Sequence, residues 1–367
     1  MAGFDGIIGQ DHIVSFLKRA SVSGKVSHAY IIDGPRMSGK KMTADAFAMS
    51  LQCRRVNEKK RLLAGEDKIS GPEIYFPEAR KDKSFAAGAS ADSAAPCLEC
   101  VSCRQAMGKN QPDIIYVTHE KPKTISVDDI REQINGDINI RPYSNPYKIY
   151  IVDEAEKMNP QAQNALLKTL EEPPSYAVII LLTTNSDSFL PTIRSRCVTL
   201  KIRPVPEYKI REYLMKNCSV PDYKAGVYAA FSQGNIGLAK QLAASQEFGK
   251  LRDDTAALAS GITENGSGEL ERYIQPFLDK KNEAEEFFDL LLIWYRDVLL
   301  YKASSDEEKL IFSDCADRVS RQAKVISWEG LENIINAIGK AGVRVRANVN
   351  YELTLRLLMQ EIKENAV

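Results

Sequence analysis

A short glycine-bearing turn has the spacing of a phosphate-binding loop. Gly34 and Gly39 are separated by four residues, and Lys40 follows directly. In such a loop the backbone N–H groups surround phosphate oxygens at the start of a helix. The next residue is normally Ser or Thr, whose hydroxyl binds Mg²⁺, but here it is Lys41, which repels the ion. Thr43 lies too far round the helix to replace it easily. The turn either keeps weak nucleotide binding or only joins a strand to a helix.

An acidic pair, Asp153-Glu154, ends the apolar strand pattern KIYIVDE. At the end of a buried strand, an Asp can hold the water shell of a metal ion and a neighbouring Glu can orient an attacking water. Both roles require the metal that Lys41 repels. The sequence therefore favours a structural role for this pair.

Four of the seven cysteines form a pattern typical of metal ligands. Cys97, Cys100 and Cys103 follow one another with two residues between them, and Cys53 ends the helix expected after the glycine-bearing turn. Four thiolates suit a tetrahedral structural Zn²⁺ with no open position. Free thiols are the alternative, and an iron–sulfur cluster is also compatible with four thiolates.

The tripeptide Ser195-Arg196-Cys197 places an arginine after another apolar strand pattern and a loop. A guanidinium group is planar and permanently charged, so it can neutralise a phosphoryl group in transfer, even from across a subunit interface. On its own the tripeptide is more typical of a surface arginine before a buried cysteine. The strand, the acidic pair and the sequence Thr-Thr-Asn upstream favour the phosphate role.

Strand and helix patterns alternate through the first half of the chain, which predicts an α/β fold with a parallel sheet and helices on both faces. The expected strands are residues 28–33, 114–118, 149–153 and 178–183. The expected helices are residues 4–21, 42–51, 127–133 and 161–170.

The strand patterns stop near residue 205, and the rest of the chain is expected to be helical. We expect a first domain at 1–205, a small helical domain at 206–247 and an all-helical domain at 248–367. The clearest helix of the last domain, 286–301, is apolar on more than one face and is expected in the core of a bundle. The segment 54–96 ends in a run rich in Ala and Ser, so we expect it to be a flexible insertion.

The composition describes an ordinary protein of a reducing compartment. Lys and Arg together number 49 and so do Asp and Glu, so no global positive charge attracts the chain to nucleic acid. The apolar runs are too short to span a bilayer, and the start of the chain lacks the pattern of a signal peptide. We expect a cytoplasmic protein with no membrane partner.

Together these motifs make the chain similar to the clamp-loader branch of the AAA+ P-loop ATPases. The segments HAYIIDGP, NPYKIYIVDEAEKMNPQAQNALLKTLEEPP and the Ser-Arg-Cys motif resemble the delta-prime subunit family of the bacterial DNA polymerase III clamp loader over essentially the whole length. In that family the helical domains are a lid and an oligomerisation collar. The resemblance implies a zinc module held by the four cysteines and speaks against an iron–sulfur cluster.

The resemblance also implies roles for individual residues. Arg196, preceded by Ser195, would be an arginine finger that reaches the ATP of a neighbouring motor subunit. Gly34, Gly39, Lys40, Asp153, Glu154 and Asn185, the last in the sensor-1 position, would be remnants of a nucleotide site. ATP-hydrolysing relatives carry a sensor-2 arginine where this chain has Gly237. ATP binding is therefore expected to be weak or absent.

The implied function is that of a non-hydrolysing stator, a component of the DNA-directed DNA polymerase holoenzyme. Its partners would be the gamma/tau motor and delta subunits and, through the complex, the sliding clamp and primed DNA. The alternatives are an ATP-hydrolysing gamma/tau-like motor of the same complex and an AAA+ adaptor outside replication. The motor would need Ser or Thr after Lys40 and the sensor-2 arginine, and both are absent.

Overall fold

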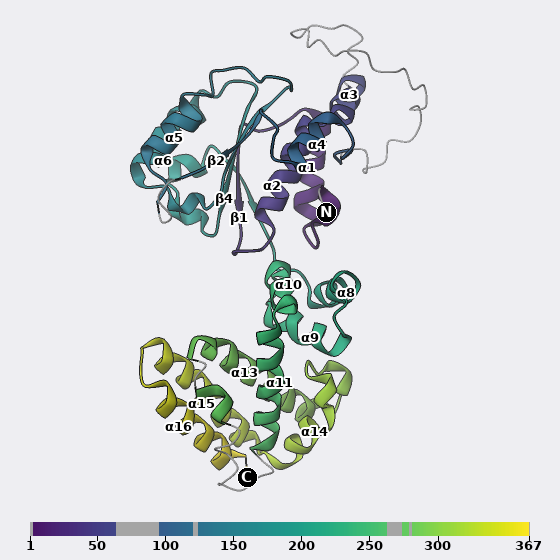
Figure 1. Cartoon of the computed structure of the whole chain (residues 1–367), viewed down its shortest axis with the longest axis vertical. Coiled ribbons are helices and arrows are strands. Elements are labelled where there is room, and N and C mark those ends of the chain that lie inside the picture. Colours follow the sequence, from purple (N-terminus) through teal and green to yellow (C-terminus); the bar gives the residue numbers. More distant parts are fainter. Residues whose placement is uncertain (1–2, 64–94, 120–123, 263–273, 279–280, 367) are drawn as a thin grey trace. The chain divides into compact units, whose positions relative to one another are not determined.

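The computed structural model describes residues 3–63, 95–119, 124–262, 274–278 and 281–366 (Figure 1). The chain forms two compact units, Met1–Pro204 and Val205–Val367. The boundary lies where the strand patterns of the sequence stop.

Within the described residues, the first unit contains a five-stranded sheet in the order β2-β3-β4-β1-β5, and every neighbouring pair is parallel. Its strands are β1 (Ala29–Asp33), β2 (Ile114–Val117), β3 (Lys148–Val152), β4 (Ala177–Thr183) and β5 (Val198–Lys201). The expected parallel sheet is confirmed. The sequence analysis missed β5, because this edge strand has only four residues and its side chains are half-buried or exposed.

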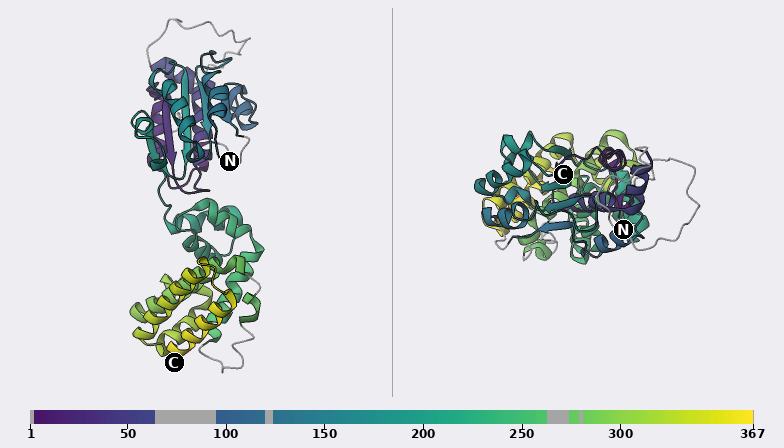
Figure 2. Two further views of the ribbon diagram at one scale, coloured as in Figure 1. Left: turned by 90° about the vertical axis from the view of Figure 1, so that its left-hand side faces the viewer. Right: turned by 90° about the horizontal axis from the view of Figure 1, so that it is seen from above.

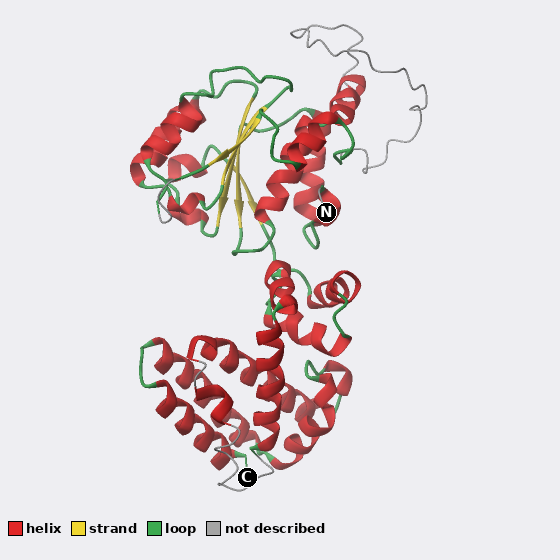
Figure 3. Cartoon of the chain, viewed as in Figure 1, coloured by secondary structure: helices red, strands yellow, loops and turns green. Residues whose placement is uncertain are grey.

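Helices cover both faces of this sheet, as Figures 1 and 3 show. Alternate residues of β1 point to opposite sides: Tyr30 and Ile32 belong to one apolar core, and Ala29 and Ile31 to the other. The helices of the first unit are α1 (Asp11–Ser23), α2 (Lys40–Gln52), α3 (Arg54–Leu63), α4 (Val101–Met107), α5 (Val127–Ile130), α6 (Pro160–Glu171) and α7 (Pro191–Arg194). The first core includes residues of α1 and α2, and the second includes residues of α5 and α6. Both faces of the strands are therefore buried, which explains their continuous apolar patterns.

Local sequence signals set the ends of these helices. The Asn159 side chain accepts a hydrogen bond of 2.7 Å from the Ala162 N–H and so caps α6, and Pro160 occupies its first turn. A capping box between Ser126 and Asp129 begins α5, which a turn of π-helix (Arg131–Asn135) extends. A 3₁₀ turn, Ala155–Lys157, separates α6 from the acidic pair that follows β3.

Two sequence expectations need correction. The sequence predicts a flexible insertion over 54–96, but residues 54–63 form α3, which packs against α1 and α2. Val56 is fully buried there, so one face of this basic helix contributes to the core. The part of the insertion at 64–94 lies outside the described residues. The N-terminal helix begins at Asp11 rather than at residue 4, because only a single 3₁₀ turn (Phe4–Gly6) forms before it.

In its described part, the second unit is built from helices without strands (Figure 2). They are α8 (Glu207–Cys218), α9 (Asp222–Phe231), α10 (Ile236–Ala244), α11 (Gln246–Gly261), α13 (Ala284–Ser304), α14 (Ala316–Val325), α15 (Trp328–Arg346) and α16 (Tyr351–Asn365). Helix α13 packs against α11, α14 and α15 and buries Trp294 and Tyr295 completely. The expected bundle-core helix is confirmed.

One buried carboxylate fixes the chain that follows α13. Asp297 on this helix is fully buried, and it accepts hydrogen bonds from the N–H groups of Ile311 (2.8 Å) and Phe312 (2.7 Å). Arg296 forms an ion pair of 2.8 Å with the same carboxylate. Burial raises the pKa of Asp297 to about 6, although these partners oppose the shift.

Among the described helices, none combines the length and apolar character needed to cross a lipid bilayer.

Candidate functional site

The lysine of the glycine-bearing turn is bonded to its own loop. Strand β1 ends at Asp33, α2 begins at Lys40, and Gly39 between them has a φ of 91°, a left-handed conformation that favours glycine. The Lys40 ammonium donates hydrogen bonds of 2.7 Å to the carbonyl oxygens of Gly34 and Pro35. Burial lowers the pKa of Lys40, while nearby carboxylates act in the opposite direction. A phosphate could bind this lysine only by competing with the two carbonyls.

Three cationic side chains pair with the acidic residues that follow β3. The Lys41 ammonium lies 3.3 Å from Oδ2 of Asp153. Glu154 forms ion pairs with Arg36, at 3.5 Å, and with Lys157. Both carboxylates that could serve a metal therefore already face cationic side chains, two of which come from the turn and the start of α2.

Hydrogen bonds fix the loop that follows the carboxyl end of β4. Asn185 follows β4, and its side-chain oxygen accepts a hydrogen bond of 3.0 Å from the N–H of Asp187. The Ser186 hydroxyl donates to Asp33 at 2.9 Å and so links the ends of β4 and β1. The residues that the sequence predicts to be remnants of a nucleotide site all lie at the carboxyl edge of the parallel sheet, where such folds bind ligands: Gly34, Gly39, Lys40, Asp153, Glu154 and Asn185. Gly237 belongs to the second unit, in the first turn of α10.

Arg196 is tied to α6 of its own chain. Its Nη2 lies 3.0 Å from Oε1 of Glu171, and its Nη1 donates a hydrogen bond of 3.0 Å to the carbonyl of Thr192. The Arg196 side chain is 36% exposed. The Ser195 hydroxyl donates to the same Thr192 carbonyl at 3.1 Å, so the turn after α7 is fixed by local bonds. A group on another molecule that binds this guanidinium would compete with Glu171 for it.

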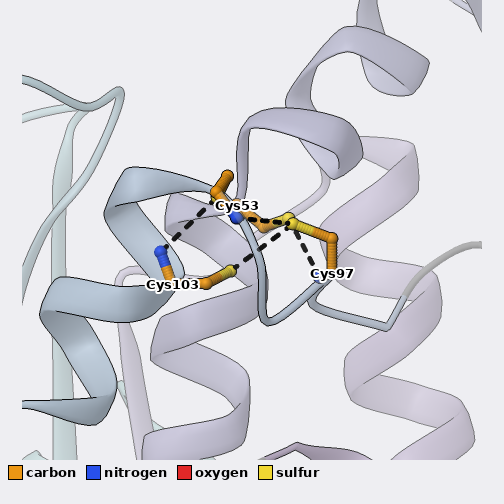
Figure 4. A group of neighbouring side chains, drawn as sticks. Cys53, Cys97 and Cys103 are labelled. Carbon is orange, nitrogen blue, oxygen red and sulfur yellow. Dashed lines mark hydrogen bonds between the residues drawn. The ribbon is translucent and has the colours of Figure 1, made fainter.

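The four cysteines come together from two distant segments of the chain. Their sulfur atoms all lie within 4.8 Å of one another, and those of Cys97 and Cys103 are 4.0 Å apart. Figure 4 shows the labelled side chains of Cys53, Cys97 and Cys103 gathered between the end of α2 and α4. Backbone N–H groups of Cys97, Cys100 and Cys103 donate to the sulfurs of Cys53, Cys97 and Cys100, at 3.3, 3.3 and 3.4 Å.

This cluster has the chemistry of a tetrahedral cation site. Zn–S bonds of about 2.3 Å require sulfurs roughly 3.8 Å apart, close to the observed separations. The hydrogen bond with Cys100 raises the pKa of Cys53 to about 11, and hydrogen bonds from neighbouring thiols lower the pKa of Cys100. The thiols thus hinder one another from ionising together, and a divalent cation would remove that conflict. The residues fit a structural metal that the sequence analysis expected to be zinc.

Sequence reasoning did not single out Arg36, a partner of Glu154, or Glu171, the partner of Arg196. Arg36 lies inside the glycine-bearing turn, and Glu171 lies in the quoted LEEPP segment. Neither residue type carries a spacing signal that identifies its partner, because both contacts depend on how the sheet is assembled.

Two protein-family models match this chain. The model described as "DNA polymerase III, delta subunit" matches residues 9–68 and 79–206. The model described as "DNA polymerase III, delta subunit, C terminal" matches residues 273–364.

The curated relatives differ in how much of their own length aligns with this chain. The DNA polymerase III subunit delta' of Bacillus subtilis is 26% identical over 360 residues, which are 97% of this chain and 96% of the relative. The subunit tau of the same organism is also 26% identical, over 92% of this chain but only 57% of the relative. A solved Thermotoga maritima protein related to the gamma subunit matches 98% of this chain and 100% of its own, with 20% identity and a TM-score of 0.41. An identity and a TM-score this low support no conclusion about function.

Proposed function

Because this chain belongs to the DNA polymerase III delta subunit family and is a subunit of the clamp loader, we propose that it is the delta-prime-type stator, which does not hydrolyse ATP. Its partners would be the gamma/tau motor and delta subunits and, through the complex, the sliding clamp and primed DNA. Within the second unit, residues 206–247 would form the lid and residues 248–367 the collar that joins the ring.

The pairing of Lys41 with Asp153 carries this proposal. An ATPase of this class needs a hydroxyl at the position of Lys41 and a carboxylate directed at the metal at the position of Asp153. Here the two positions neutralise each other at 3.3 Å, and Gly237 offers no charge to a phosphate. The isolated chain should therefore show no ATP hydrolysis. A steady turnover that Lys40→Ala abolishes would support the gamma/tau-like motor instead.

Coverage of the relatives also favours the delta-prime assignment over the motor. Identity to the two Bacillus subtilis subunits is equal, so it does not discriminate. The alignment nevertheless spans almost all of delta' and just over half of tau. An AAA+ adaptor outside replication has no observation in its favour.

Arg196 would act on the ATP of the neighbouring motor subunit. Its pair with Glu171 lies at the surface, with the two side chains 36% and 51% exposed, so the pair contributes little stability and can be exchanged for a phosphate. Ser195 would support the turn that presents the guanidinium. The four cysteines would hold Zn²⁺, whose contribution is to fix the end of α2 to α4.

The test is reconstitution of the loader with motor and delta subunits, followed by DNA-dependent ATPase and clamp-loading assays. Arg196→Ala should leave assembly intact, as judged by gel filtration, and should slow loading. Arginine fingers contribute about 10³–10⁵ in rate at their own site. The loss of loading rate for the whole ring is smaller when the other active sites still hydrolyse ATP. Arg196→Lys should rescue poorly, because lysine lacks the planar fork.

Arg194 provides a matched control two residues away. It is similarly exposed and forms an ion pair with Asp187. Arg194→Ala should load clamps at close to the wild-type rate. An Arg196→Ala ring that assembles and loads at the wild-type rate would refute the arginine-finger role.

A further inference from the structure

A cavity of about 840 Å³ lies in the first unit, between α3, α4 and the loop at 143–146. Its lining includes Pro112 and Pro146, which lie just before β2 and β3 with one residue between, and Gln52 at the end of α2. It therefore opens at the amino edge of the parallel sheet, whereas the glycine-bearing turn lies at the carboxyl edge. The cavity is thus separate from the nucleotide-site remnant.

The wall of this cavity carries excess positive charge. Its charged lining residues are four basic and one acidic: Arg54, Lys60, Arg61, Arg104 and Glu58. Glu58 pairs with Arg54 at 2.9 Å, and Lys60 donates a hydrogen bond of 2.9 Å to the hydroxyl of Tyr147. Arg61 and Arg104, one on α3 and one on α4, are exposed. Cys100 also lines the cavity, and four thiolates with one Zn²⁺ would carry a net charge of −2, which the net +3 of the lining exceeds.

An aromatic side chain stands at the rim on a fixed turn. Tyr143 lines the cavity and is 87% exposed. Its backbone N–H donates a hydrogen bond of 2.6 Å to Asp113, whose carboxylate also accepts from the N–H of Ser144 (3.0 Å) and the amide of Asn145 (3.1 Å). Asp113 is itself buried, with 1% of its surface exposed. The turn is therefore held from within while its largest apolar side chain faces solvent.

The same turn is joined to the cysteine module. The Ser102 hydroxyl on α4 donates to Asn145 at 3.3 Å and accepts a hydrogen bond of 2.9 Å from Gln111. The basic wall and the aromatic rim are thereby fixed relative to each other, which limits the conformational entropy lost when a ligand binds.

We propose that this cavity binds single-stranded nucleic acid, with phosphates held by Arg61 and Arg104 and a base stacked on Tyr143. Basic side chains that follow a backbone, combined with an exposed aromatic ring, are what sequence-tolerant binding of single strands requires. The volume accommodates a ligand of nucleotide size. An acidic peptide would satisfy the charges but would leave the face of Tyr143 without a specific partner.

The test uses the full-length chain with zinc and a fluorescein-labelled 20-mer of deoxythymidylate, followed by fluorescence anisotropy at several salt concentrations. Tyr143→Ala should weaken binding about 5- to 100-fold, the range for the loss of one stacked base. The double variant Arg61→Ala/Arg104→Ala should weaken binding and lower the salt slope by about 1.4, since each phosphate contact to a single strand contributes roughly 0.7.

Matched controls lie in the second unit. Tyr208 is 64% exposed on α8, and Lys240 and Lys250 are exposed. Tyr208→Ala and Lys240→Ala/Lys250→Ala should bind the oligonucleotide as the wild-type chain does. Circular dichroism should show all variants folded, since the substituted side chains are exposed.

Three results would overturn the proposal. They are no binding by the wild-type chain at 50 mM salt, unchanged binding by both cavity variants, or equal displacement of the oligonucleotide by polyglutamate, which would identify a site for acidic peptides. None of them would affect the assignment as a clamp-loader stator, which depends on the Lys41–Asp153 pair at the carboxyl edge of the sheet.

Discussion

Lys41 and Asp153 are 112 residues apart in the sequence, yet the lysine ammonium lies 3.3 Å from the aspartate carboxylate. The lysine stands where a P-loop hydroxyl would bind Mg²⁺, and the aspartate stands where a second metal contact would be. In this chain the two positions form an internal ion pair. If these positions are the remnant of a nucleotide site, as we propose, the ion pair neutralises its metal position.

Lys41→Thr should restore metal-dependent nucleotide binding. The hydroxyl supplies a ligand and frees Asp153, so ATP should bind about tenfold more tightly with Mg²⁺ than without it, the scale of one bond to a charged group. Calorimetric titration of ATP with and without Mg²⁺ measures this. Addition of Lys40→Ala should abolish the gain, and an affinity that is indifferent to Mg²⁺ would contradict the interpretation.

The purified chain should contain one Zn²⁺, which Cys100→Ser removes. Because thiolate ligation is coupled to local folding, this variant should become sensitive to limited proteolysis around α3 and α4. Both tryptophans, Trp294 and Trp328, lie in the second unit, so their fluorescence should not change. Cys218→Ser, outside the cluster, should keep the metal. Wild-type protein without zinc, or with iron and visible absorbance, would reject this assignment.

Glu171→Gln should separate the ion pair that Arg196 makes within this chain from its proposed contact with the ATP of the neighbouring subunit. It removes the charge that holds the guanidinium within this chain and should lower the free energy of unfolding by less than about 1 kcal/mol, because the pair is half-exposed. A reconstituted loader with this variant should keep its clamp-loading rate, unlike one with Arg196→Ala. If both variants lose loading equally, the pair itself is what the loader requires.

Gly330→Ala should destabilise the second unit. A Cβ at this position of α15 would lie 2.3 Å from the backbone oxygen of Asn365, closer than packing allows. We expect the free energy of unfolding to fall by about 1–3 kcal/mol, as measured by urea unfolding that is followed by tryptophan fluorescence. Gly339 on the same helix has nothing within 4 Å of its Cβ position, so Gly339→Ala should instead stabilise by about 0.5–1 kcal/mol. Equal shifts for the two variants would show that α16 does not approach α15 this closely.

Asp297 should make stability fall as pH rises between about 4 and 6. Its pKa is raised to about 6 in the folded chain and is roughly 3.9 when unfolded, so the folded state binds more protons in this window. Asp297→Asn keeps an acceptor for the N–H groups of Ile311 and Phe312 but does not titrate. As pH rises across this window, the free energy of unfolding of the variant should increase by about 2–3 kcal/mol relative to that of the wild type in the same urea assay. A difference that stays constant from pH 4 to pH 7 would refute the shift.

The sequence by itself determined the chemistry and most of the elements. Four of the five strands, the P-loop remnant with Lys41, the four cysteines and the Ser-Arg-Cys motif could all be identified there, because glycine spacing, thiol spacing and apolar runs are local signals. The parallel sheet and the helical second half could be predicted from the same alternation and from its end near residue 205.

Only the tertiary structure decided which of these residues meet. The pairs Lys41–Asp153 and Arg196–Glu171 form because the sheet order brings the ends of distant strands and helices together. The first pair lies at the carboxyl edge of the sheet and the second at the amino edge, and no local pattern encodes that order. The same holds for Asp113, which looks like any aspartate in the sequence but is buried under the turn that carries Tyr143. Short elements such as β5 and α3 were missed for a related reason. Their few apolar residues gain stability from a core built by other segments, so their own sequence carries little of the signal.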